Sequence, residues 1–342
     1  MTHLFVALGQ NHIIKFESLI KNEYVEDGQK ILLGGSNVTV NKQIWDKTIL
    51  SKTSFNNNAS SFFEQFVTIK SKIKSYSEII NQLNEYKNDD ITVYVSYIED
   101  VLSNFIFLNF NKNSKGVVVE DGTLNYYDHS FKNINKVKFY LKKIISLYYK
   151  IKFQKYQGHS SGADYSHVCS NFLTFPEHAF VAKNAKPLPL KKEIISKPIN
   201  ALYIIGQEPF GNVLGLEKFY KVLNDFFCTL KNQTFYADIE KIYYKPHRNG
   251  VQLTEAYLKS FFIEKELKVI YSEKTSEELF FEEITCIYIS SFNSSSLTTI
   301  YSKLPENEKS NFNFYVYPII NNELANLFQK LNFNFLNNKL TN

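Results

Sequence analysis

Two adjacent carboxylates and a glycine, Glu120-Asp121-Gly122, follow directly after the apolar residues 117–119. Asp-Gly between β-branched and aromatic residues is a strong local signal for a hairpin turn. A carboxylate at the C-terminal end of a strand can also take a proton from an attacking hydroxyl group. The local pattern leaves both interpretations open: a turn without chemistry, or a general base presented by a strand.

Three further polar motifs follow apolar runs in the second half of the chain. In Lys245-Pro246-His247-Arg248, a loop histidine beside two cations could bind a phosphate, although a solvated basic turn is the alternative. Residues 290–297, SSFNSSSL, precede a helical pattern, and serines at a helix start either bind an anion or simply cap the helix.

The last of these motifs is Gly206-Gln207-Glu208-Pro209, which follows the first apolar run of the second half. A turn from a strand into glycine is often where the backbone approaches a nucleotide.

Short apolar runs that alternate with helical patterns predict the elements that position these motifs. Strand–helix–strand order indicates an α/β protein with parallel sheets. All four motifs lie at C-terminal ends of predicted strands, where such proteins bind ligands. Strands are predicted at residues 4–8, 31–33, 91–98, 105–110, 117–120, 201–205, 242–245, 267–271, 286–290 and 312–317. Helices are predicted at 12–23, 59–87, 137–153, 217–230, 297–304 and 321–333.

A change in composition divides the chain into two halves. Residues 183–198, KNAKPLPLKKEIISKP, contain three prolines and five lysines, which is typical of an extended linker. We therefore predict an N-terminal domain over residues 1–182 and a C-terminal domain over 199–342, with the ligand held in the cleft between them.

The composition of the 342 residues limits the partners. The net charge of +5 suits anionic partners such as nucleotides, acidic sugars or a lipid surface, and no nucleic-acid reading motif is present. The apolar neighbours of Cys169, Cys228 and Cys286 predict buried free thiols, and their spacing does not suit zinc.

The N-terminus is predicted to be a first strand and not a signal peptide, and no apolar run is long enough to span a membrane. We therefore expect a cytoplasmic protein. Residues 137–153 are either a surface helix with one buried face or a basic amphipathic helix, which would place the protein peripherally on the inner membrane.

The order of the motifs resembles that of the bacterial sialyltransferases of the GT-B fold. Glu120-Asp121-Gly122 resembles their D/E-D/E-G triplet, His247-Arg248 their His-Pro motif, and Ser294-Ser295-Ser296 their Ser/Thr-rich motif. The segments around Gly206-Gln207 and Phe175-Pro176-Glu177 resemble family 52 glycosyltransferases, which include lipooligosaccharide sialyltransferases. A triplet that begins with Glu resembles the polysialyltransferases of family 38. One departure is that proline precedes His247 and arginine follows it.

The resemblance implies two Rossmann-like domains facing a central cleft. It implies an inverting transfer of sialic acid from CMP-sialic acid to a terminal galactoside of a lipooligosaccharide or capsule, without a metal or another cofactor. Glu120 would be the general base, supported by Asp121 and Gly122, and His247 would stabilise the departing CMP phosphate. Donor binding would fall to Gly206, Gln207, Lys245, Arg248, Ser294, Ser295 and Ser296.

Three alternatives stay open. The protein could extend an existing sialic acid chain as a polysialyltransferase, or use another nucleotide sugar. It could also be a non-catalytic module that binds a glycan or a nucleotide, which the departure at Arg248 would favour.

Overall fold

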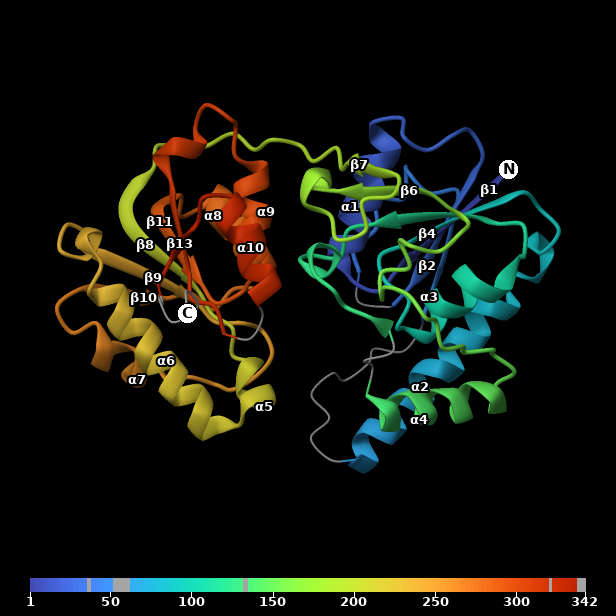
Figure 1. The fold of residues 1–342 in the computed structure, drawn as a ribbon, viewed down its shortest axis with the longest axis horizontal. Helices are drawn as coiled ribbons and strands as arrows, with labels where there is room; N and C mark the ends of the chain where they lie inside the picture. Colours follow the sequence, from blue (N-terminus) through green and yellow to red (C-terminus); the bar gives the residue numbers. More distant parts are fainter. Residues whose placement is uncertain (36–37, 52–61, 132–134, 320–321, 337–342) are drawn as a thin grey trace. The chain divides into compact units, whose positions relative to one another are not determined.

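The computed structural model describes residues 1–35, 38–51, 62–131, 135–319 and 322–336. The chain divides into two compact units, Met1–Leu190 and Lys191–Asn342. Each unit is built on one sheet in which every strand pair is parallel (Figure 1). The predicted α/β class with two parallel sheets is therefore confirmed.

The first unit has a seven-stranded sheet with the order β3-β2-β1-β4-β5-β6-β7. All residues of β1 and β4 are buried, as expected for parallel strands covered on both faces. The strands are β1 (Thr2–Ala7), β2 (Gln29–Gly34), β3 (Lys47–Leu50), β4 (Ile91–Val95), β5 (Lys115–Val119), β6 (Val168–Leu173) and β7 (Ala185–Pro187).

Helices cover both faces of this sheet. One hydrophobic cluster contains Phe5 of the sheet with Phe16 of α1, and the other contains Val93 with Ile73 of α2. The helices are α1 (Gln10–Lys21), α2 (Phe62–Asn81), α3 (Val101–Phe105), which continues as a π-helical turn η2 (Ile106–Phe110), and α4 (Lys136–Tyr148). Short 3-10 turns are η1 (Asn84–Tyr86), η3 (Leu124–Tyr126) and η5 (Pro176–His178).

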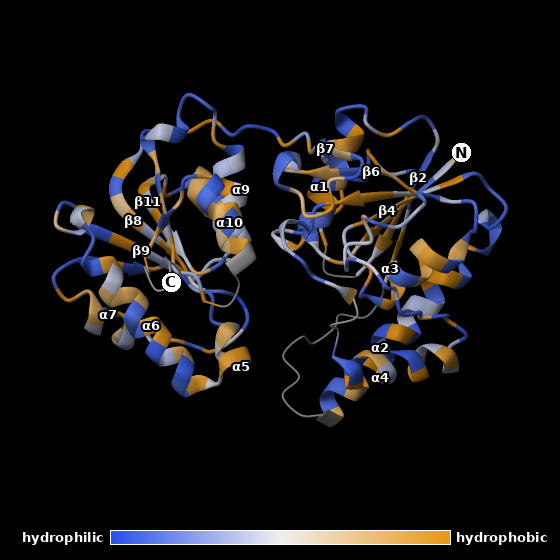
Figure 2. Ribbon diagram, viewed as in Figure 1, coloured by the Kyte–Doolittle hydropathy of each residue, from blue (hydrophilic) through white to orange (hydrophobic). Residues whose placement is uncertain are grey.

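The second unit has a six-stranded sheet with the order β10-β9-β8-β11-β12-β13. Figure 2 shows hydrophobic colour along its strands and alternating colours along its helices. The strands are β8 (Ile199–Ile205), β9 (Lys241–Lys245), β10 (Glu266–Val269), β11 (Cys286–Ser291), β12 (Asn313–Val316) and β13 (Asn334–Phe335). The helices are α5 (Phe210–Leu214), α6 (Leu216–Lys231), α7 (Glu255–Phe261), α8 (Ser276–Glu282), α9 (Ser295–Lys303) and α10 (Asn322–Lys330), with 3-10 turns η6 (Thr234–Tyr236) and η7 (Lys309–Asn311).

Three predictions differ from the structure: a strand at residues 105–110, an extended linker at 183–198, and three buried cysteines. Residues 105–110 are helical, because Asp100 caps α3 through the N–H of Leu102 (3.0 Å) and the helix runs on into η2. The predicted linker 183–198 contains β7, which pairs with β6 in the first sheet. Cys286 is buried as expected, but Cys169 and Cys228 are exposed free thiols. The part of the predicted helix 59–87 before residue 62 lies outside the described residues.

The close approach of β1 and β2 gives a test of this core. Gly34 is in register with Ala7, and a Cβ atom at Gly34 would lie 2.2 Å from the carbonyl oxygen of Ala7. Gly34→Ala should therefore lower the free energy of unfolding by about 1–3 kcal/mol. Gly35→Ala is the matched control, because its Cβ would meet nothing within 4 Å. Urea unfolding should separate the two variants, and equal losses would contradict this packing.

Candidate functional site

The predicted motifs all lie at the C-terminal edge of their own sheet. Glu120 follows β5 in the first unit, and Gly206, His247 and the serine segment follow β8, β9 and β11 in the second. In the second sheet β8 lies between β9 and β11, so the loops after these three strands are neighbours.

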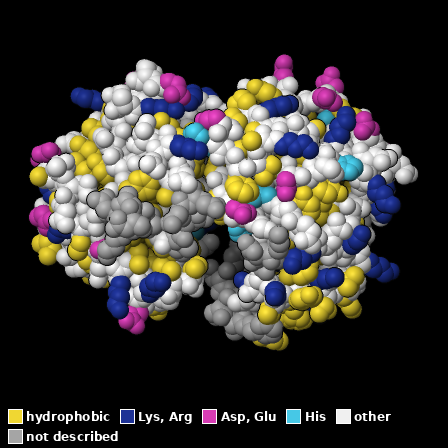
Figure 3. Space-filling view, viewed as in Figure 1, with side chains coloured by type: hydrophobic (Ala, Val, Ile, Leu, Met, Phe, Trp, Pro, Cys, Tyr) yellow, Lys and Arg dark blue, Asp and Glu magenta, His cyan; other side chains and the backbone are white. Residues whose placement is uncertain are grey.

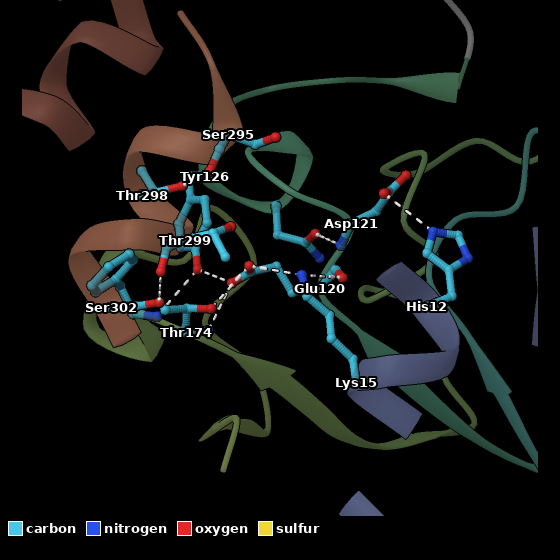
Figure 4. Close-up of polar contacts among 12 residues, drawn as sticks. His12, Lys15, Glu120, Asp121, Tyr126, Thr174, Ser295, Thr298, Thr299 and Ser302 are labelled. Atoms are coloured by element: carbon cyan, nitrogen blue, oxygen red, sulfur yellow. Dashed lines mark hydrogen bonds and ion pairs between the residues drawn. The ribbon is translucent and has the colours of Figure 1, made fainter. Parts of the chain in front are cut away.

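In the first unit, the carboxylate of Glu120 is buried and fully bonded (Figure 4). Its Oε1 accepts hydrogen bonds from Lys15 Nζ (3.1 Å) and Thr174 Oγ1 (2.9 Å). Its Oε2 accepts from the backbone N–H of Thr174 (2.7 Å) and from the hydroxyl of Tyr126. A carboxylate offers about four lone-pair positions, so these donors leave none for a substrate hydroxyl.

Two of these donors are themselves held in place. Lys15 Nζ also donates to the carbonyl oxygen of Glu120 (2.9 Å). Burial, and then the negative charge of Glu120, raise the pKa of Tyr126 well above its usual value, so its hydroxyl stays protonated and donates. The Tyr126 oxygen accepts the N–H of Phe175 (3.1 Å), which places the Phe175-Pro176-Glu177 segment beside Glu120.

Asp121 has a different environment from Glu120. Its side chain is 36% exposed, and Oδ1 lies 3.2 Å from His12 Nε2. Because His12 Nδ1 accepts the N–H of Leu8 (3.2 Å), the ring proton is on Nε2 and is donated to Asp121. Figure 4 shows His12 and Lys15 reaching from one side of α1 to Asp121 and Glu120 respectively.

The charge state of Asp121 follows from these contacts. Burial alone would raise the pKa of this carboxyl. The hydrogen bond from His12, together with the charge of Lys15, outweighs burial and holds the pKa below its usual value. Asp121 is therefore an ionised, partly exposed carboxylate at neutral pH, so it can accept a proton, although its lowered pKa makes it a weak base.

The backbone at Asp121 forms the predicted turn but no hairpin. Gly122 has a φ of +54°, the N–H of Leu124 donates to the carbonyl of Asp121 (3.2 Å), and the N–H of Asp121 donates to Asn125 Oδ1 (3.1 Å). The chain then enters η3, while β5 pairs with the parallel strands β4 and β6. The geometry thus favours Asp121 over Glu120 as the group available for chemistry.

A second polar cluster follows β4, the neighbour of β5. Glu99 Oε1 lies 3.1 Å from His129 Nε2, and Asp100 Oδ2 lies 3.0 Å from Lys72 Nζ of α2. Lys142 of α4 donates to the carbonyl oxygen of Glu99 (2.8 Å). These bonds tie α2 and α4 to the sheet edge that carries Asp121.

In the second unit, Glu208 organises the loop that carries His247. Glu208 is 1% exposed, and its oxygens accept the hydroxyl of Tyr244 (2.6 Å) and the N–H of His247 (2.7 Å). A Cβ at Gly206 would lie 2.6 Å from both carboxylate oxygens, so glycine is needed for this contact. Burial raises the pKa of Glu208. The sequence motif contains Glu208, but its buried role could not be read from the sequence.

A second hydrogen bond joins two other predicted motifs. Gln207 Nε2 donates to the hydroxyl of Ser294 (3.1 Å). Ser294 caps α9 by accepting the N–H of Ser296 (3.2 Å), while Ser295 and Ser296 are partly exposed in the first turn. Two hydrogen bonds, Glu208–His247 and Gln207–Ser294, therefore connect the three loops. The start of a nine-residue helix beside them suits an anion.

Lys245 and Arg248 differ in their availability. Lys245 is buried, and its Nζ donates to the carbonyl of Ser272 (2.7 Å). Arg248 is exposed beside His247 and is the only arginine in the sequence. Because guanidinium binds phosphate and carboxylate in a bidentate manner that lysine cannot reproduce, Arg248 is the stronger candidate for an anionic ligand.

The described residues contain no group of three or more His, Cys, Asp or Glu side chains that could hold a metal ion. Within the same described ranges, no helix is both long and apolar enough to cross a bilayer.

No protein-family model matches the chain, and no curated protein matches its sequence. Solved structures do match its fold. An α/β-galactoside α-2,3-sialyltransferase from Photobacterium phosphoreum is 14% identical, with a TM-score of 0.51 over 99% of this chain and 97% of that one. The fold is GT-B. A 2,6-sialyltransferase from a Photobacterium species, solved with CMP and lactose, is 11% identical, with a TM-score of 0.50 over 98% and 78% of the chains. The predicted likeness to GT-B sialyltransferases thus holds at the level of the fold.

The ion pair behind the triplet can be tested by stability. Lys15→Met should lower the free energy of unfolding by about 3–5 kcal/mol, because the buried Glu120 carboxylate loses its cation. Adding Glu120→Gln should restore part of the loss, since the buried group is then neutral. Lys21→Met at the exposed end of α1 is the control and should cost less than about 0.5 kcal/mol in the same urea titration. Equal losses from Lys15→Met and Lys21→Met would contradict the buried pair.

His247 should show an unusual titration. Burial, aided by the charges of Arg248 and Lys245, outweighs the hydrogen bond to Asn249 and lowers the pKa of His247. Its NMR midpoint should lie below about 6.5. Arg248→Ala should raise the midpoint, while Arg248→Lys keeps the charge and should leave it unchanged.

The lowered pKa of His247 also predicts how the free energy of unfolding changes with pH. Since the unfolded chain protonates His247 first, this residue's contribution to stability is complete above pH about 6.5 and declines as the pH falls below that value. His247→Gln should remove that decline. A wild-type midpoint at or above 6.5 would contradict the assignment.

Proposed function

We propose that the protein is an inverting sialyltransferase, which moves sialic acid from CMP-sialic acid to a terminal galactoside of a bacterial surface glycan such as lipooligosaccharide or capsule. The observation that carries the proposal is the joining of Gly206–Glu208, His247 and Ser294 into one loop cluster at the start of α9. Its support is the GT-B fold shared with sialyltransferases, one of which was solved with CMP and lactose.

In the proposed reaction, the first unit supplies the base. Ionised Asp121 takes the proton of the acceptor hydroxyl as its oxygen bonds to the anomeric carbon of sialic acid. Glu120, assigned this role from the sequence, instead fixes the loop through Lys15 and Thr174. His12 orients Asp121 and keeps it ionised.

The second unit, in this proposal, holds the donor. The bond from the anomeric carbon to the CMP phosphate oxygen breaks, and negative charge grows on that oxygen. In the tautomer whose Nδ1 accepts the N–H of Asn249 (3.1 Å), neutral His247 presents its Nε2–H. This N–H, the guanidinium of Arg248 and the start of α9 stabilise the charge more in the transition state than in the ground state. Lys245, Ser295 and Ser296 line the same edge. The proposal therefore requires neither a metal nor a cofactor, and free cysteines fit a cytoplasmic enzyme.

The alternatives now have less support. The glutamate that begins the triplet favoured a polysialyltransferase. The carboxylate of Glu120, however, is buried and bonded to Lys15 and Thr174, so its identity is explained by packing and does not indicate the acceptor. The departure at Arg248 favoured a non-catalytic module, yet an exposed lone arginine also suits the donor's phosphate or carboxylate. Both remain outcomes of the experiment below.

The proposal is tested in two steps. CMP should raise the melting temperature more than UMP, UDP or GDP does. Incubation with CMP-sialic acid and lactose should then release CMP and form sialyllactose. Turnover only with sialylated acceptors would assign polysialyl transfer, and stabilisation by CMP without any turnover would assign a binding module. Selective stabilisation by UDP or GDP would overturn the choice of donor.

Asp121→Asn should lower kcat by about 10²–10⁴-fold at an unchanged melting temperature, because the base is lost while the loop is kept. The sequence supplies a matched control in a second Glu-Asp-Gly triplet, Glu26-Asp27-Gly28, which precedes β2 and is exposed at Glu26 and Asp27. Asp27→Asn should leave kcat unchanged. Full activity in Asp121→Asn would remove the residue from this role.

A further inference from the structure

Helix α4 is apolar on two sides, and one of them is exposed. Phe139 and Ile145 are buried on the inner side. The exposed stripe repeats every three or four residues, which places it on one side of the helix. It consists of Val137 (64% exposed), Tyr140 (59%), Ile144 (67%), Leu147 (61%) and Tyr148 (77%).

Helix α2 packs against α4 and also exposes apolar side chains. Phe63 is 73% exposed and Val67 is 47% exposed, and Lys70 and Lys74 continue the same line at helical spacing. Figure 3 shows hydrophobic and lysine side chains gathered over these helices. We call the five α4 residues together with Phe63 and Val67 the α2–α4 face.

Along α4, every charged side chain near the α2–α4 face is a lysine. Lys136 and Lys143 are exposed and lie seven residues apart, so both border the stripe on the same side. The sequence contains no Asp or Glu between Asp128 and Asp164, which brackets all of α4. On α2, Glu64 is the acid nearest Phe63 in sequence.

We propose that the α2–α4 face binds the surface of an anionic lipid bilayer. The apolar side chains would enter the headgroup region, and the bordering lysines would pair with lipid phosphates. A second copy of the chain is a poorer occupant, because a two-fold contact through this face would set lysines against lysines. Binding through this face does not depend on sugar transfer.

The proposal predicts flotation of the full chain with vesicles of phosphatidylcholine that contain phosphatidylglycerol, but not with vesicles of phosphatidylcholine alone. Added salt should weaken the binding. Ile144→Glu/Leu147→Glu should reduce it about tenfold or more, as should Lys136→Glu/Lys143→Glu. Because all four side chains are exposed, the melting temperature should not change.

The matched control is Val213→Glu/Ile263→Glu, which places two glutamates at exposed apolar positions of the second unit (71% and 82% exposed) and should float like the wild type. Wild-type protein that stays unbound on anionic vesicles would overturn the proposal, as would equal loss in the control. Concentration-dependent dimerisation that Ile144→Glu/Leu147→Glu abolishes, without vesicle binding, would also overturn it and assign the face to a second copy.

Discussion

The buried carboxylate of Glu120 is the constraint on which the first unit's functional edge depends. Its donors come from three separated parts of the chain: Lys15 on α1, Tyr126 on η3 and Thr174 after β6. A buried anion is tolerated only when its partners are complete, so these segments must meet in one arrangement. That arrangement also fixes the neighbouring residue, since α1 carries both Lys15 and His12. The buried side chain of Glu120 thereby positions the partly exposed side chain of Asp121.

Much of the fold could be predicted, because buried parallel strands are short apolar runs between helical patterns. Four strands escaped prediction because they lack that pattern. β6 is interrupted by Ser170 and Asn171, and β7 contains a proline beside the predicted linker. β3 has one buried residue among four, and β13 has only two residues. Residues 105–110 do have the apolar pattern of a strand but are helical, because a short apolar run looks the same in a strand and in a buried helix. The Asp100 cap was the available signal for the helix.

The site was predictable as a set of positions and less so as a set of roles. Glu-Asp-Gly occurs twice in the sequence, and only the topology separates the copy before β2 from the copy after β5. Which carboxylate is free depends on partners more than a hundred residues away, such as Lys15, and spacing cannot reveal them. Glu208 was hidden in the same way, because its bonds to Tyr244 and His247 exist only in the folded unit.

The two lysines that tie α2 and α4 to the end of β4 have a mechanical consequence. Lys72 of α2 pairs with Asp100, and Lys142 of α4 donates to the carbonyl oxygen of Glu99, so both helices are bonded to the sheet edge that carries Asp121. A surface that engages the outer side of α2 and α4 is therefore held at a set height from that carboxylate. Under the two proposals above, this distance selects acceptors, because only glycans whose terminal sugar reaches that far from the bilayer surface meet Asp121.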